Sequence, residues 1–283
     1  MLGLACAALG FLAAVVAQDD LQGPNIYNLS QLSWSLHNTN GSIVVPAKVP
    51  SCAHLDLLAA GVITEPTVGL NDGLQRWIPY EPVWTYTANA SQLSTFASQY
   101  DEAYLVFNGL DTVTNEASGN LTLDFGSPTL YADEQHNITG FNATPLSDTY
   151  EFLHREMIRK TQSDFGWDWG MAAAPVGVYK CAYLVGLSAS NTSAPALYEA
   201  NTLIDIYRKG QVPNLPPDQT TDWVVNVSAQ VVSAQNFPSP QMVISIPELN
   251  LTSPTMAVEA IKAGQDSTIN ASFSVPANAP QLW

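Results

Sequence analysis

The sequence predicts an all-β protein made of packed sheets, and three observations lead to that fold class. Apolar and polar residues alternate in short runs, which is the period of a strand with one buried face. Gly, Pro, Asn and Ser separate these runs as turn residues. Long amphipathic helical patterns are absent, apart from a turn or two near 150–159. The predicted strands are 83–87, 102–107, 121–125, 182–187, 202–207, 223–232 and 241–246.

The first 17 residues form an apolar segment that predicts secretion. Leu2 to Val16 carry no charge, and small side chains precede the end of the segment at Ala17, as a signal peptidase requires. The run is too short to span a bilayer, and no later segment has about 18 unbroken apolar residues. We therefore predict a signal peptide at 1–17 and a secreted, extracellular protein.

One short helix is predicted at 54–60, after a strand-like and aromatic stretch at 21–34. Ser51 is placed to cap the helix and Gly61 to end it. His54 could in principle be catalytic, but no serine or cysteine with a suitable partner stands out. We interpret His54 as a structural histidine whose hydrogen bonds are satisfied.

Residues 159–170 contain the most distinctive motif of the chain. Trp167 and Trp169 flank Asp168, with a glycine on either side. A pyranose ring can stack its C–H patches on an indole, and a carboxylate can accept hydrogen bonds from sugar hydroxyls. The alternative is that both indoles are core residues on one face of a strand, while Asp168 points to water or caps a turn.

A second aromatic and acidic stretch, 69–84, is also a candidate for sugar contacts, because binding residues are often on loops. It contains Trp77, Tyr80, Glu81 and Trp84.

A domain boundary is predicted close to 211–218, where prolines and polar residues interrupt the strand pattern. We assign 18–207 to a first domain and 208–283 to a second one. The second is the size of a small or incomplete immunoglobulin-like sandwich.

The charge balance excludes some classes of partner. The chain has 25 acidic and 9 basic residues, so nucleic acid and anionic membranes would repel it. Charged residues are only 12% of the chain. A neutral ligand suits this composition better.

Cysteine usage does not indicate a metal site, and the motifs indicate no cofactor. Only Cys52 and Cys181 remain after removal of the predicted signal peptide. They could form a disulfide in an oxidising compartment, and two buried thiols are the alternative.

Ten N-x-Ser/Thr sequons support the prediction of a secreted glycoprotein, in which they would mark exposed loops or strand ends. They are at Asn28, Asn40, Asn89, Asn120, Asn137, Asn142, Asn191, Asn226, Asn250 and Asn270.

A series of blocks distributed over most of the chain identifies a family resemblance. The blocks are Val49-Pro50, 54–57, 61–63, Asn71, Trp77, 84–86, 106–112, 159–160, 165–170 and 201–207. In this order and spacing they resemble the β-mannosidases of glycoside hydrolase family 2, particularly secreted fungal ones. The resemblance is specific between about residues 34 and 223 and looser beyond.

The resemblance implies a jelly-roll domain similar to galactose-binding modules, followed by a partial immunoglobulin-like sandwich. In the family, a (β/α)₈ barrel follows and carries two catalytic glutamates that cleave terminal non-reducing β-mannosides with retention. This chain stops before the barrel, and nothing in it matches those glutamates, so no catalytic residue is assigned. Asp168 would bind hydroxyls of the terminal mannose, and Trp167 and Trp169 would form the pocket wall.

Three features depart from the family pattern. Met171 stands where a proline commonly follows the Trp-Asp-Trp-Gly motif, the region between Thr114 and Leu121 is shortened, and Trp283 falls just before the segment that leads into the barrel. We therefore favour the N-terminal part of an exo-acting β-mannosidase, inactive alone. The alternative is a secreted lectin-like module without catalysis, and a third reading is a scaffold whose tryptophans are all core.

Overall fold

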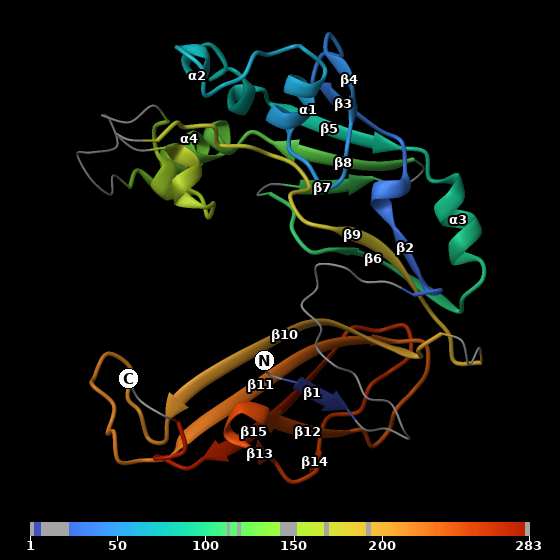
Figure 1. Cartoon of the computed structure of the whole chain (residues 1–283), viewed down its shortest axis with the longest axis vertical. Coiled ribbons are helices and arrows are strands. Elements are labelled where there is room, and N and C mark those ends of the chain that lie inside the picture. Colours follow the sequence, from blue (N-terminus) through green and yellow to red (C-terminus); the bar gives the residue numbers. More distant parts are fainter. Residues whose placement is uncertain are drawn as a thin grey trace. The chain divides into compact units, whose positions relative to one another are not determined.

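The computed structural model describes residues 3–6, 23–111, 114–117, 120–141, 152–166, 170–190 and 194–280. These residues form mostly β-structure, as predicted (Figure 1). They divide into two compact units, one of residues 1–26, 97–104 and 185–283 and one of residues 27–96 and 105–184.

A five-stranded antiparallel sheet is the largest sheet of the second of these units. Its strand order is β4–β3–β5–β8–β7 (Figure 1). Every second side chain is buried along β3 and β8, which is the expected pattern for strands with one face on a core. The strands are β3 (Trp34–Asn38), β4 (Val44–Ala47), β5 (Val83–Ala88), β7 (Thr114–Ala117) and β8 (Leu121–Gly126).

A three-stranded sheet has the order β2–β9–β6. Its strands are β2 (Ile26–Asn28), β6 (Glu102–Phe107) and β9 (Ala182–Leu187). The central strand β9 is buried at every position, which explains its unbroken apolar sequence. The prediction of strands at 102–107 and 182–187 is confirmed.

The predicted short helix is present as α1 (Ala53–Ala59), but its N-cap is Cys52 and not Ser51. The Ser51 hydroxyl instead donates to Asp56 Oδ1 at 2.9 Å. Two further short helices are α2 (Asn71–Leu74) and α3 (Ser91–Ala97).

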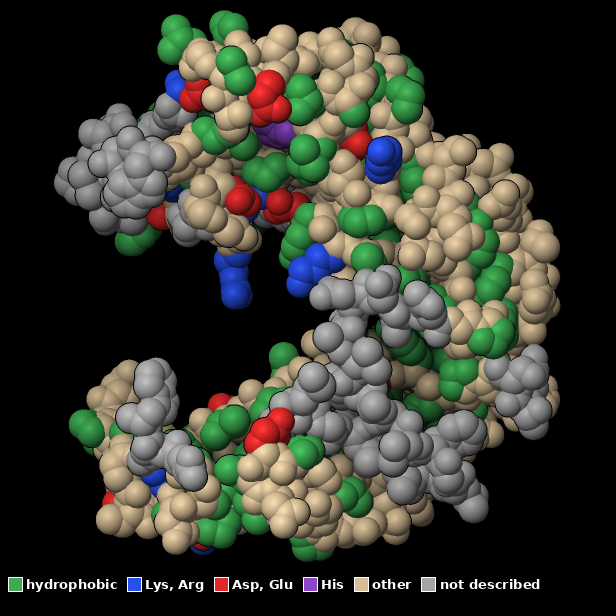
Figure 2. All heavy atoms as spheres, in the orientation of Figure 1, with side chains coloured by type: hydrophobic (Ala, Val, Ile, Leu, Met, Phe, Trp, Pro, Cys, Tyr) green, Lys and Arg blue, Asp and Glu red, His purple; other side chains and the backbone are tan. Residues whose placement is uncertain are grey.

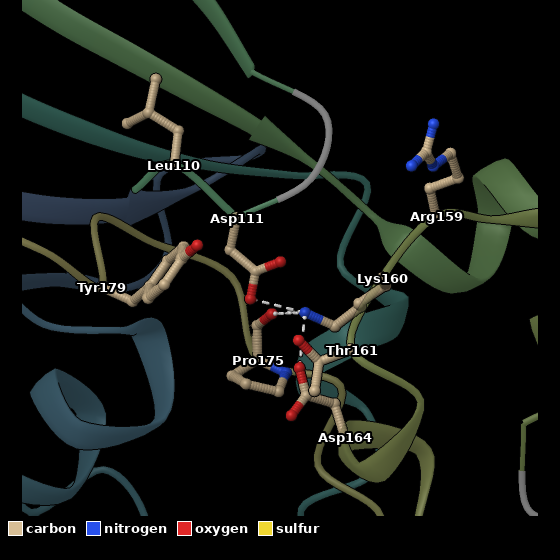
Figure 3. Close-up of a pocket in the computed structure, with 8 residues that line it drawn as sticks. All are labelled: Leu110, Asp111, Arg159, Lys160, Thr161, Asp164, Pro175 and Tyr179. Carbon is tan, nitrogen blue, oxygen red and sulfur yellow. Dashed lines mark hydrogen bonds and ion pairs between the residues drawn. The ribbon is translucent and has the colours of Figure 1, made fainter. Parts of the chain in front are cut away.

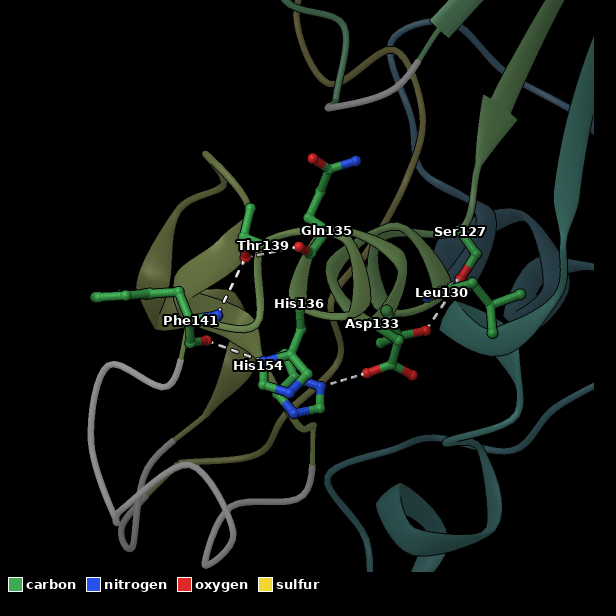
Figure 4. Close-up of polar contacts among 9 residues, drawn as sticks. Ser127, Leu130, Asp133, Gln135, His136, Thr139, Phe141 and His154 are labelled. Atoms are coloured by element: carbon green, nitrogen blue, oxygen red, sulfur yellow. Dashed lines mark hydrogen bonds and ion pairs between the residues drawn. The ribbon is translucent and has the colours of Figure 1, made fainter.

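Helix α4 (Pro128–Thr139) is not predicted by the apolar pattern, because its buried residues are only Pro128, Thr129 and Ala132. Its ends are nevertheless marked in the sequence. The Ser127 hydroxyl accepts from Leu130 N, Pro128 opens the helix, and Gly140 ends it with a φ of 63°. Figure 4 shows this cap.

Close to the C-terminal end of α4, two histidine rings stack (Figure 4). The rings of His136 and His154 are 3.7 Å apart and almost parallel. His136 Nδ1 lies 2.9 Å from the carbonyl of Phe141, and His154 Nδ1 lies 2.8 Å from Asp133 Oδ1. These contacts attach residue 154 to α4.

Single-turn 3₁₀ helices connect the other elements: η1 (Leu29–Gln31), η2 (Ile78–Tyr80), η4 (Arg155–Met157), η5 (Gln162–Phe165) and η6 (Pro247–Leu249). The helical turn predicted near 150–159 is η4.

Strands β10 to β15, together with the N-terminal strand β1, form two sheets around one core. One sheet has the order β10–β11–β15, with β10 (Leu197–Arg208), β11 (Trp223–Ser233) and β15 (Ser267–Val275). The other has the order β1–β12–β13, with β14 also paired to β12. Its strands are β1 (Gly3–Cys6), β12 (Gln241–Ile246), β13 (Leu251–Thr252) and β14 (Met256–Ala257).

The inner face of the β10–β11–β15 sheet is covered unevenly. Val225 and Val227 of β11 are in the core, and their partners on β10 are Ile206 and Ile204. Although they lie on the core side, Ile204 and Ile206 are 42% and 56% exposed. The inner face is therefore covered at these residues of β11 but not at Ile204 and Ile206 of β10.

The pairing of strand β10 differs from the domain boundary that we predicted. We placed residues up to 207 in the first domain, but β10 pairs with β11 from Leu197 to Arg208. It therefore belongs with the C-terminal sheets. Strand β1 lies inside the predicted signal segment and pairs antiparallel with β12.

The surface in Figure 2 shows few charged side chains among uncharged polar groups and backbone, in agreement with the low content of charged residues. No helix within the described ranges is both long and apolar enough to cross a membrane.

Candidate functional site

Trp167, Asp168 and Trp169, the predicted sugar-binding residues, lie outside the described residues. The segments on both sides of them are described, and they form the base of a tight loop. The carbonyl of Asp164 accepts hydrogen bonds from the backbone N–H groups of Ala173 and Ala174, at 3.0 and 2.8 Å. The chain therefore returns to its starting point within ten residues.

Gly166 is required for this return. Its φ is +71°, and an added Cβ would lie 2.8 Å from both Ala172 N and Gly170 O. Only a residue without a side chain tolerates both the backbone conformation and the close approach. The glycine before the Trp-Asp-Trp motif thus has a definite structural role.

The segment that leads to the loop alternates between buried and exposed residues. Ile158 and Lys160 are buried, whereas Arg159 and Thr161 are exposed. Ile158 belongs to an apolar cluster with Phe152. This packing turns Lys160 into the protein and Arg159 toward solvent.

Lys160 is the charged centre of the site (Figure 3). Its Nζ lies 2.5 Å from Asp111 Oδ2, 2.7 Å from the carbonyl oxygen of Pro175 and 3.1 Å from Asp164 Oδ2. The Lys160 side chain is fully buried, and the side chains of Asp111 and Asp164 are 18% and 25% exposed. One ammonium group thus joins the distant residue Asp111 to both sides of the loop base.

A pocket of about 410 Å³ opens beside this cluster, and Figure 3 shows its lining. Carboxylates, hydroxyls and a guanidinium group surround it, together with the apolar side chains of Leu110 and Pro175. Such groups can accept from and donate to the hydroxyls of a neutral polyol. The lining residues are Leu110, Asp111, Arg159, Lys160, Thr161, Asp164, Pro175 and Tyr179.

The opposite wall of the pocket is held by backbone pairing. Leu110 and Val178 form an isolated antiparallel bridge, and Asp111 N donates to the carbonyl of Gly177 at 3.0 Å. An added Cβ on Gly109 would lie 2.6 Å from the ring of Tyr179, so only glycine at this position leaves room for the ring. The Asn-Gly-Leu-Asp run at 108–111 is the sequence signal for this wall, and only the family resemblance drew attention to it.

The second aromatic stretch, 69–84, does not line this pocket. Trp84 is 1% exposed and its indole N–H donates to the carbonyl of Ile78, so it is a core residue. Trp77 is 37% exposed and lies 6.0 Å from Trp84. Tyr80 packs against Phe152.

His54 is buried near the charged cluster and is not a candidate base. Burial, with a smaller effect of the positive charge of Lys160, lowers the pKa of His54 to about 4. Contrary to the prediction that its hydrogen bonds are satisfied, Nδ1 has no hydrogen-bond partner among the residues that the structure describes.

Asp56 and Tyr86 form a buried pair under α1. The Tyr86 hydroxyl donates to Asp56 Oδ2 at 2.8 Å. Burial raises the pKa of Asp56, although the Tyr86 and Ser51 hydroxyls partly oppose this by donating to the carboxylate. Burial and the nearby Asp56 charge raise the pKa of Tyr86. Both groups therefore have a structural role.

Cys52 and Cys181 are not joined by a disulfide. Burial raises the pKa of the Cys52 thiol, which makes it a poor nucleophile.

Eight of the ten predicted glycosylation sites are described, and six of their side chains are exposed: Asn40, Asn89, Asn120, Asn137, Asn250 and Asn270. Asn28 and Asn226 are half-buried, and Asn142 and Asn191 lie outside the described residues. Asn226 and Asn270 are within strands, contrary to the expectation of loops and strand ends, and face away from the core of the β10–β11–β15 sheet. In the described ranges, no group of three or more His, Cys, Asp or Glu side chains could hold a metal ion.

Comparison with known families finds one matching model, described as a glycosyl hydrolase 2 galactose-binding domain-like domain. It matches residues 34–115 and 113–180. The pocket and the loop base are within this range.

Similar proteins extend the match to most of the chain. A β-mannosidase A of Aspergillus terreus is 37% identical over 278 residues, which cover 86% of this chain and 28% of the relative. A β-mannosidase A of Aspergillus flavus is 39% identical over 235 residues, which cover 78% and 25%. The chain therefore spans little more than a quarter of these relatives.

Among solved structures, the crystal structure of a β-D-mannosidase from Dictyoglomus thermophilum has the same fold over 91% of this chain and 32% of its own length. The TM-score is 0.57 and the sequence identity is 18%.

Proposed function

Because this chain belongs to the glycosyl hydrolase 2 galactose-binding domain-like family, we propose that it is the N-terminal part of an exo-acting β-mannosidase. In such an enzyme it contributes one wall of the pocket for the terminal non-reducing β-D-mannose of mannans and oligosaccharides. We assign the chemistry of hydrolysis to the rest of such an enzyme, since this chain matches only 28% of the Aspergillus terreus relative.

The polar pocket beside the loop base, where Asp164 meets Ala173 and Ala174, is the observation that supports this proposal most directly. It offers the carboxylates of Asp111 and Asp164 and the hydroxyls of Thr161 and Tyr179 to a ligand with many hydroxyl groups. The sequence places Asp168 in the loop that leaves from the same base.

A hydrolysis assay tests whether catalysis is absent. We expect the purified chain to leave p-nitrophenyl β-D-mannoside intact, because retaining hydrolysis requires two carboxyl groups about 5 to 5.5 Å apart across the scissile bond. Turnover that Asp168→Ala abolishes would show that this chain holds a complete active site.

A binding assay tests the sugar wall itself. In saturation-transfer NMR, methyl β-D-mannoside should receive signal from the chain at millimolar concentration and lose it with Asp168→Ala. Methyl β-D-galactoside is the matched sugar control, and it should give a weaker signal. If neither sugar receives signal from the chain, the proposal is contradicted.

The alternative function is a lectin-like module that acts without a barrel. The existence of a 410 Å³ pocket in this chain alone is the observation that favours it. Calorimetry with mannobiose separates the two functions. A half pocket should bind in the millimolar range or weaker, whereas a module that works alone should bind about tenfold more tightly or better.

A further inference from the structure

The Lys160 ammonium group is saturated by the protein itself. An ammonium has three N–H donors, and here they meet three acceptors: Asp111 Oδ2, Asp164 Oδ2 and the carbonyl of Pro175. Because the side chain is fully buried, it contributes to the pocket through the groups it holds.

Those groups come from three separate segments. Asp111 follows the bridge at Leu110, Asp164 is in η5, and Pro175 is on the chain that returns from the loop. The backbone of Asp164 also accepts the N–H groups of Ala173 and Ala174. Lys160 thus ties both pocket carboxylates and both sides of the loop base to one point (Figure 3).

We propose that Lys160 is the positioning residue of the pocket: its buried ammonium fixes the two carboxylates, Asp111 and Asp164, as a pair of acceptors for sugar hydroxyls. This inference rests on the proposed function for the identity of the ligand. The cluster itself can be tested without a ligand.

Removal of the ammonium leaves the carboxylates of Asp111 and Asp164 without their shared counter-charge. Both carboxylates contact the same Nζ, at 2.5 and 3.1 Å, so they lie close together. Like charges that lie close together disfavour ionisation, so at least one of the two carboxylates should have a raised pKa in Lys160→Met. A carboxylate with a raised pKa in the folded state stabilises the fold at low pH, and that contribution is lost as pH rises through the raised pKa. The stability of Lys160→Met, relative to that of wild type, should therefore fall between about pH 4 and about pH 7.

Three variants and one control make the test. Lys160→Met removes the charge, and Lys160→Arg keeps it in a shape that cannot reproduce the three contacts. Lys160→Met with Asp164→Asn removes the repulsion as well, and it remains informative if the single variant does not fold. Lys262→Met is the matched control, because it removes one lysine charge from an exposed position elsewhere.

The first measurement is urea unfolding as a function of pH, together with amide hydrogen exchange over residues 161–176. In Lys160→Met we expect the pH-dependent loss described above and exchange at Ala173 and Ala174 that is at least about tenfold faster. In the double variant only the smaller pH dependence that comes from His54, whose pKa the Lys160 charge lowers, should remain, and Lys160→Arg should be intermediate. A purely packing role would give the same pH dependence in Lys160→Met and in the double variant.

The second measurement is the affinity for methyl β-D-mannoside at about pH 7, expected to be at least fivefold weaker in Lys160→Met and partly restored in Lys160→Arg. Unchanged pH dependence and exchange in Lys160→Met, as in Lys262→Met, would overturn the inference. A wild-type chain that binds no mannoside would instead overturn the proposed function, and the pH and exchange measurements would still decide the role of Lys160.

Discussion

His54 shows how burial of a single side chain links stability to pH. Its pKa is lowered to about 4, first by burial and then by Lys160, and the side chain is 8% exposed. A histidine with a lowered pKa stabilises the fold above its unfolded pKa of about 6.5, and this contribution is lost as pH falls toward the folded value.

Replacement of His54 should remove that part of the acid sensitivity. We expect wild type to lose about 3 kcal/mol of unfolding free energy from this group between about pH 6.5 and pH 4. His54→Asn should be less stable at neutral pH but have a shallower slope, measured by urea unfolding at a series of pH values. Replacement of His37, which is half-buried, is the control. Equal slopes for wild type and His54→Asn would contradict this explanation.

At the scale of elements, Gly177 allows the chain segment at 176–178 to lie directly against the start of α1. Ser51 N donates to the carbonyl of Val178, and Ala53 N donates to the carbonyl of Val176. A Cβ on Gly177 would lie 2.7 Å from both Cys52 Cα and Ser51 O, which are backbone atoms, and its φ is +148°. The contact leaves no room for a side chain.

Gly177→Ala should therefore destabilise the protein by about 2 to 4 kcal/mol, because both strain and a backbone clash must be relieved. Gly73→Ala is the matched control, since nothing lies within 4 Å of its added Cβ, and it should change stability by less than about 1 kcal/mol. Thermal and urea unfolding of the two variants give the comparison. Similar effects of the two substitutions would show that the close approach at Gly177 is relaxed in solution.

The elements also show what the sequence can predict. Strands β6, β9 and β12 have the predicted bounds, because alternation or unbroken burial gives a clear period. Strand β15 was missed although Ile269, Ala271, Phe273 and Val275 alternate with polar residues in the period of a strand. Helix α4 was missed because it has no continuous apolar stripe, and only its caps could have predicted it.

The pocket could be predicted only in part, for a related reason. The loop near Gly166 was found from local composition. The partnership of Lys160 with Asp111 was not, because the two residues are 49 positions apart and no local pattern records their contact. Contacts between distant segments are visible only in the folded structure.

At the scale of the whole molecule, the ten sequons and the N-terminal segment lead us to propose a secreted glycoprotein. The negative charge of −16 argues against nucleic acid or anionic lipid as partners. Both proposals concern the chain's environment and are independent of its sugar specificity.

Expression in a eukaryotic secretory host tests the glycoprotein proposal. We expect the chain in the medium, lacking residues 1–17, with a mass that decreases on treatment with peptide N-glycosidase F. Asn270→Gln should remove one glycan increment, whereas Asn214→Gln, which is outside any sequon, should leave the mass of the glycoprotein almost unchanged. An intracellular, unmodified chain would contradict the proposal.

If the chain is a glycoprotein, its glycans would cover only one side of the β10–β11–β15 sheet. Asn226 and Asn270 stand on the side that faces away from the core, whereas Ile204 and Ile206 are exposed on the other side. Branched oligosaccharides at those asparagines would form a hydrated screen over one surface and keep other macromolecules at a distance from it. Any polypeptide that shields the two isoleucines must then approach from the unscreened side.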